Sequence, residues 1–80
     1  MATVNFTVEG LALHGAGTAF SEIVRALAEQ GFAAARFDPG RQLFSVEIDP
    51  ANQSFSDVRR AVSDLGRRKG LIYLAVVMSP

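Results

Sequence analysis

The stretch VEGLALHGAGT, residues 8–18, marks the change from a strand to a helix and decides how the rest of the chain is interpreted. Before it, Thr3–Glu9 alternates polar and apolar residues with a period of two, which is typical of a half-buried strand. Three glycines and the lack of a period predict a loop within it, and Thr18 is a residue type that caps helices. From Phe20 onward apolar residues recur at helical spacing, and Gly31 can end that helix in a left-handed conformation.

A hairpin is predicted next in the chain. Phe32–Phe37 is interpreted as a strand because the turn sequence DPGR, residues 38–41, follows it directly. In that turn proline is preset for the second position, and Gly40 can supply a positive φ. Residues 44–49 then alternate between apolar and polar, so the two strands are expected to pair.

The last part of the chain predicts a second helix and a final strand. Ser54 and Asp57 have the spacing of a capping box, and an apolar helical stripe follows until Gly66. After a basic connection, Leu71–Met78 is the longest apolar run and is predicted to form the last strand. Because a membrane-spanning helix needs about 20 apolar residues, no membrane insertion is expected.

The order of the elements predicts the fold class. A βαββαβ order is typical of a ferredoxin-like α+β sandwich, in which a four-stranded antiparallel sheet carries two helices on one face. Right-handed crossovers would place the first and third strands in the centre. The loops of residues 10–17 and 66–70 would then lie at the same end of the sheet. We expect residues 1–80 to form a single domain.

The composition excludes several classes of protein. A chain of 80 residues, 49% of them apolar, can bury one small core but has little room for a deep pocket. The absence of cysteine excludes disulfides, thiolate metal sites and thiol catalysis. The N-terminal sequence lacks the basic and apolar regions of a secretory signal, so a cytoplasmic location is expected. Eight acids balance eight bases overall, but five of the bases and only one acid lie in residues 58–80.

The sequence GLALHGA, residues 10–16, resembles the opening of the heavy-metal-associated domain family. That family includes small metallochaperones and the N-terminal modules of metal-pumping ATPases, and its signature is a strand, then GMTCxxC, then a helix. Gly10–Ala12 approximates the GMT part, and VEIDP at residues 46–50 approximates the VxYDP of the family. The resemblance covers nearly the whole chain, and it implies the ferredoxin-like fold and a lineage concerned with metal transport.

Leu13 and Ala16 stand where the resembling family has its two cysteines. In the family, the thiolates of those cysteines bind soft metal ions at the start of the helix. Leucine and alanine offer no lone pair to a metal, so a two-coordinate sulfur site is excluded here. The resemblance therefore implies a degenerate metal-binding loop and no cofactor.

One alternative is a metal site built on His14, the only histidine. It lies between the two degenerate positions, and imidazole can bind borderline metal ions. Because zinc sites use at least three protein ligands, His14 would need carboxylates or a second copy of the chain. This alternative predicts weak binding of a divalent metal ion through a site without cysteine.

A second alternative is an anion-binding or small-ligand-sensing domain. The N–H groups at the start of the first predicted helix would attract an anion, and cations from the second loop would lie near them. The residues of this predicted site are Gly15, Gly17, Thr18, Arg67, Arg68 and Lys69.

Neither catalysis nor nucleic-acid binding is indicated by the sequence. It contains no nucleophile elbow and no HExxH motif, and its isoelectric point of about 6.5 argues against an electrostatic nucleic-acid binder. We expect a non-enzymatic module for protein interaction or regulation. Its expected partner is a protein, either a metal-pumping ATPase or a second copy of this chain.

Overall fold

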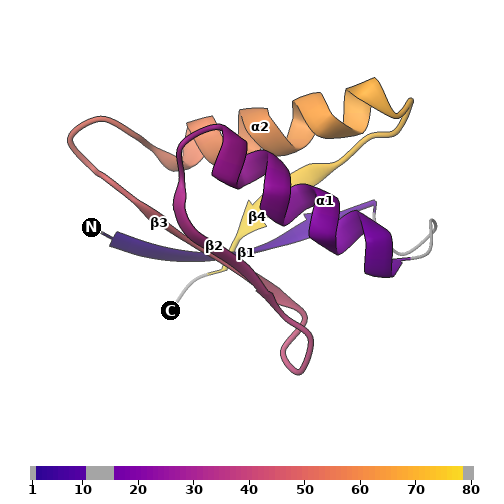
Figure 1. The fold of residues 1–80 in the computed structure, drawn as a ribbon, viewed down its shortest axis with the longest axis horizontal. Helices are drawn as coiled ribbons and strands as arrows, with labels where there is room; N and C mark the ends of the chain where they lie inside the picture. The colour runs from indigo at the N-terminus through magenta and orange to yellow at the C-terminus, as the bar shows by residue number, and fades with distance from the viewer. Residues whose placement is uncertain (1, 11–15, 79–80) are drawn as a thin grey trace.

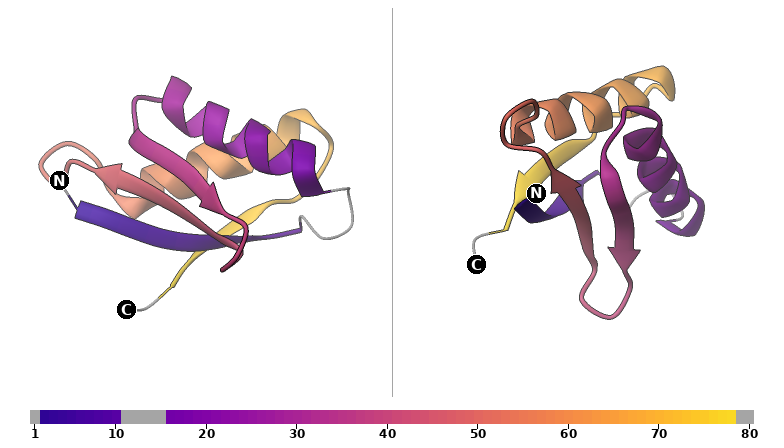
Figure 2. Two further views of the ribbon diagram at one scale, coloured as in Figure 1. Left: turned by 60° about the horizontal axis from the view of Figure 1, so that its bottom comes forward. Right: turned by 60° about the vertical axis from the view of Figure 1, so that its left-hand side comes forward.

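The computed structural model describes residues 2–10 and 16–78, and the described chain forms one sheet with two helices on one of its faces (Figures 1 and 2). The strands run antiparallel wherever they pair, in the order β2-β3-β1-β4. The ferredoxin-like fold class is thereby confirmed, with the first and third strands in the centre. The elements are β1 (Ala2–Glu9), α1 (Ala16–Glu29), β2 (Ala33–Asp38), β3 (Leu43–Ile48), α2 (Phe55–Arg68) and β4 (Leu74–Val77).

The core lies between the sheet and the helices, and its centre is built by the two middle strands. Phe6 of β1 is paired with Phe44 of β3, and both are buried because alternate residues of a strand point to the same face. Their rings stack with centroids 5.3 Å apart. The apolar stripes of the helices, with Ile23 in α1 and Val62 in α2, are buried against them, as the helical spacing predicts.

Both helices end in a Schellman motif, in which two N–H groups after the helix bond back to its last carbonyls. At the end of α1, Gly31 has a φ of 91°, and the N–H of Phe32 donates to the Leu27 carbonyl at 3.1 Å. The predicted role of Gly31 is confirmed. At the end of α2 the same role belongs to Gly70, with a φ of 74°, and the Leu71 N–H donates to the Gly66 carbonyl at 2.8 Å.

The predicted end of the second helix at Gly66 is therefore wrong. Gly66 lies inside α2, where a Cβ atom would come within 3.0–3.1 Å of three carbon atoms of Tyr73. The glycine is needed for close packing of Tyr73 and not for ending the helix. As a result Arg67 and Arg68 belong to α2, and the last strand is shorter than predicted, beginning at Leu74 instead of Leu71.

The start of the first helix and the left-handed residue of the turn also differ from the sequence prediction. Helix α1 begins at Ala16, two residues before the predicted cap at Thr18. In the turn of the predicted hairpin, Gln42 has the positive φ, at 56°, whereas Gly40 does not. The Asp38 carboxylate accepts a hydrogen bond from the Gly40 N–H at 3.0 Å, so the aspartate fixes the turn and the left-handed residue falls later.

The second helix begins as predicted. The N–H of Ser54 donates to the Asp57 carboxylate at 2.9 Å, which is the acidic half of a capping box. Asp57 also places a negative charge in the first turn, where it interacts favourably with the helix dipole.

The two glycines with φ near 90° provide a test of this fold. Alanine at Gly31 would meet no atom within 4 Å, whereas a Cβ at Gly10 would collide with the Ile72 carbonyl oxygen. We expect Gly31→Ala to lower the free energy of unfolding by about 1–2 kcal/mol, because the Cβ of alanine is strained in a left-handed conformation. Gly10→Ala should cost at least about 1 kcal/mol more, because the chain before β4 must shift. Chemical denaturation of both variants measures the difference, and equal losses would contradict the close approach of Gly10 to Ile72.

Candidate functional site

The residues predicted to form a site divide into two groups. Leu13, His14 and Gly15 lie outside the described residues. The backbone of residues 16–18 forms the first turn of α1. The three predicted cations lie at the other end of the chain, in the last turn and the C-cap of α2.

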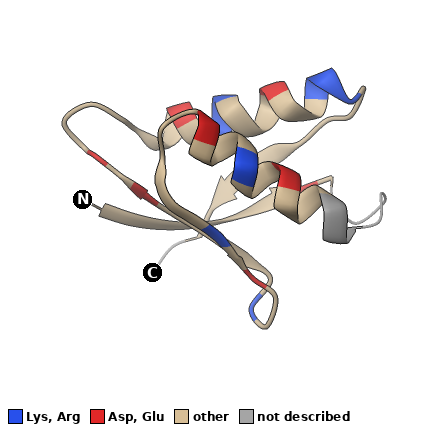
Figure 3. Cartoon of the chain, viewed as in Figure 1, with Lys and Arg blue, Asp and Glu red and all other residues tan. Residues whose placement is uncertain are grey.

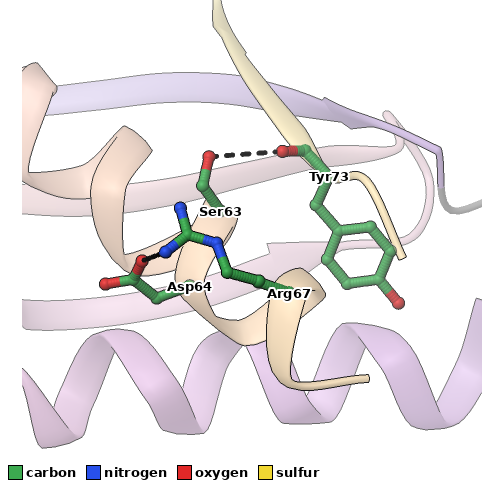
Figure 4. Close-up of polar contacts among 4 residues, drawn as sticks. All are labelled: Ser63, Asp64, Arg67 and Tyr73. Carbon is green, nitrogen blue, oxygen red and sulfur yellow. Dashed lines mark hydrogen bonds and ion pairs between the residues drawn. The ribbon is translucent and has the colours of Figure 1, made fainter. Parts of the chain in front are cut away.

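The basic residues are engaged in different ways. Arg67 pairs with Asp64 of its own helix, with nitrogen and oxygen 3.6 Å apart, and the arginine side chain is 80% exposed (Figure 4). Lys69 reaches across to α1, where its ammonium group binds the Glu22 carboxylate. Arg68 is exposed. Among the described residues, only Lys69 of the three cations forms an ion pair with α1.

The contact between Lys69 and Glu22 places the end of α2 beside the first half of α1. Residues 11–15, which make up most of the first of the two loops predicted to be neighbours, lie outside the described residues. The hydrogen bond from Lys69 to Glu22 is the main cause that raises the pKa of Lys69 above its usual 10.5. Because Glu22 already neutralises Lys69, an added anion would have to compete with this carboxylate for the ammonium group.

The role of Tyr73 as a packing residue was not found in the sequence. Tyr73 is 3% exposed and its ring lies against Gly66. Its hydroxyl oxygen is buried and has no hydrogen-bond partner among the described residues. The Ser63 hydroxyl donates to the Tyr73 carbonyl at 3.4 Å, which joins α2 to the segment before β4 (Figure 4).

A largely apolar groove lies between α1 and the edge strand β2. Its volume is about 620 Å³. Phe20 of α1 and Phe37 of β2 stack at one end of it, with ring centroids 3.9 Å apart. Small side chains leave the rest open, since Ala28 and Ala35 line it where larger residues would fill it.

Two guanidinium groups also line this α1–β2 groove. Arg25 comes from α1 and Arg36 from β2, and both residues are exposed. Neither forms an ion pair with another described residue. Figure 3 shows basic positions on both α1 and the hairpin that contains β2. The groove therefore combines an apolar floor with positive charge, which suits a partner that offers an apolar side chain flanked by carboxylates.

The described residues contain no group of three or more histidine, aspartate or glutamate side chains placed to hold a metal ion. They also contain no helix that is long and apolar enough to cross a membrane.

The pairing of Lys69 with Glu22 has a consequence that titration can measure. We expect Glu22→Gln to lower the pKa of Lys69 toward 10.5, as followed by NMR of its ammonium group. In the folded protein the pKa is raised, so the stabilisation is complete below pH 10.5 and is lost as the pH rises through the higher folded value. Asp64→Asn is the control and should leave the pKa of Lys69 unchanged. An unchanged pKa in Glu22→Gln would show that the pair does not form in solution.

Comparisons with known proteins support the fold. No family model matches the sequence, and no curated protein sequence matches it. Among solved structures, the crystal structure of oxidized MerP from Ralstonia metallidurans CH34 is similar, with a TM-score of 0.73 and 19% sequence identity. The superposition covers 98% of this chain and 97% of that one. The chain therefore shares the ferredoxin-like fold of MerP over nearly its full length.

Proposed function

We propose that this protein is a non-enzymatic interaction module, built on a fold of the metal-handling type, that binds a partner protein and does not transfer metal. One observation carries the proposal. The fold matches that of MerP along 98% of the chain, yet the sequence contains no cysteine and has Leu13 and Ala16 at the expected ligand positions. A hydrocarbon side chain cannot coordinate a soft metal ion, so the frame persists without its thiolate chemistry.

The α1–β2 groove supplies a surface for such a partner. Phe20 and Val24 offer apolar contact area, and Arg25 and Arg36 offer charge-assisted hydrogen bonds to carboxylates. A few residues dominate the binding energy of most protein interfaces, and arginine is enriched among them. We propose a cytoplasmic partner such as the metal-binding module of a metal-pumping ATPase, bound through an acidic and apolar segment.

The anion-sensing alternative receives less support from the arrangement of the cations. Lys69 is paired with Glu22, and Arg67 with Asp64. The positive charge that would attract a phosphate is therefore partly neutralised before a ligand arrives.

Isothermal titration with Cu(I), Zn(II) and Hg(II) tests the loss of metal transfer. We expect no 1:1 binding tighter than micromolar in the unaltered protein, because two hydrocarbon side chains stand at the expected ligand positions. Leu13→Cys combined with Ala16→Cys is the matched variant, and it should gain tight Cu(I) or Hg(II) binding if the loop retains its frame.

Tight binding by the unaltered protein would contradict the proposal. His14→Ala would then show whether the histidine site is responsible, since that alternative requires the imidazole.

Charge reversal in the groove tests the docking surface. Arg25→Glu and Arg36→Glu should each weaken binding to the ATPase metal-binding module of the same organism by about tenfold, as expected for a lost charge-assisted contact. Arg41→Glu in the β2–β3 turn makes the same change in net charge outside the groove and should have little effect. Fluorescence anisotropy or NMR titration measures the affinities. Equal weakening by all three variants would indicate only a general electrostatic attraction.

A further inference from the structure

The two edges of the sheet are protected to different degrees. In the edge strand β2, Ala34 has a φ of 53°, and the register against β3 shifts between Ala33 and Arg36. The strand also carries charge at Arg36 and Asp38. Bulges and charged side chains are the usual means by which proteins prevent an edge strand from pairing with another chain.

The opposite edge, β4, has none of these features. Its register with β1 is continuous from Phe6 opposite Val77 to Glu9 opposite Leu74. The segment of residues 71–78 contains no charged residue and no proline. An edge of this kind leaves a row of backbone N–H and C=O groups open for pairing.

The exposed apolar side chains of the described surface gather along this same edge. Every large hydrophobic residue that is exposed among the described residues lies in the segment 72–78. They are Ile72 at 90% exposed, Leu74 at 44%, Val77 at 49% and Met78 at 44%. A concentration of exposed apolar residues on one uncharged strand marks an interaction surface.

We propose that β4 pairs antiparallel with β4 of a second copy of this chain, so that two four-stranded sheets join into one of eight strands. The pairing is self-complementary. A two-fold axis through Ala75 places Ile72 opposite Met78, and Leu74 opposite Val76, of the other copy. Apolar side chains of one copy thus meet apolar side chains of the other. The paired segments themselves bring no like charges together, because residues 71–78 contain none.

The short length of the strand sets the strength of this contact. Four residues at about 3.3 Å each give a ladder roughly 13 Å long. Such a contact buries less than the ~800 Å² per partner of a standard stable interface. We therefore expect a dissociation constant of roughly 10 µM to 1 mM and a fast exchange between monomer and dimer.

This contact is independent of the proposed α1–β2 groove, because β2 and β4 lie at opposite edges of the sheet. Failure of the groove to bind a partner would leave the dimer unaffected, and the reverse also holds.

Analytical ultracentrifugation over roughly 10 µM to 1 mM tests the proposal in the expected affinity range. The unaltered chain should shift from monomer to dimer as its concentration rises. Val77→Lys places a charge on the edge and should keep the chain monomeric at the highest concentration. Leu74→Lys is the second variant, and circular dichroism checks that each variant is folded.

Leu43→Lys is the matched control for this experiment. Leu43 alternates with the buried residue Phe44, so it lies on the open face of the sheet, on β3, which β1 separates from β4. Dimerisation should be unaffected in Leu43→Lys. Loss of the dimer in this control as well would indicate face-to-face stacking of sheets and would overturn edge pairing. A monomer throughout the range would overturn the proposal outright.

The lack of cysteine allows a second readout by disulfide trapping. In antiparallel pairing, residues near the two-fold axis face their own copies at Cα distances of about 4.5–5.5 Å, which a disulfide can span. With Ala75→Cys or Val76→Cys as the single cysteine, mild oxidation should give a covalent dimer. Leu43→Cys should give little covalent dimer. Equal cross-linking at all three positions would indicate random collisions and would contradict the two-fold pairing.

Discussion

The stack of Phe6 on Phe44 is the contact on which the rest of the structure depends. It joins the two central strands at a position buried under both helices, with the ring centroids 5.3 Å apart. Phe55 at the start of α2 meets Phe6 edge-on at 5.8 Å, and Phe20 of α1 meets Phe44 in the same way at 5.8 Å. One pair of rings thus connects the sheet to each helix. In a chain of 80 residues with no disulfide, such a cluster supplies a large part of the core.

This arrangement leaves the two sides of the molecule with different surfaces. On the β2 side, small side chains in α1 and β2 open an apolar groove with two arginines beside it. On the β4 side, the sheet ends in an uncharged strand with exposed apolar residues. Surfaces of this kind can serve as interaction sites. The groove suits a partner of opposite charge, and the strand suits a copy of itself.

The proposed function separates the fold from thiolate chemistry. The ability of two thiolates to bind a soft metal depends on the sulfur atoms, whereas a fold of strands and helices depends on core packing. A chain without cysteine can therefore adopt the packing without the sulfur ligands. The similarity of its fold to that of MerP over 98% of the chain at 19% identity is consistent with this separation, because a core tolerates many apolar substitutions that keep its volume.

The sequence by itself determined the element order, the helix-ending role of Gly31 and the capping contact of Asp57, because each follows from local periodicity or a local hydrogen bond. It could not distinguish Gly66 from Gly70 as the end of α2. Both are glycines after an apolar stripe, and only the packing of Tyr73 requires the first to lie inside the helix. Likewise, the pairing of Lys69 with Glu22 and the groove between α1 and β2 were decided by the tertiary structure alone. Residues far apart in the chain form these features, and their contacts depend on how the helices pack on the sheet.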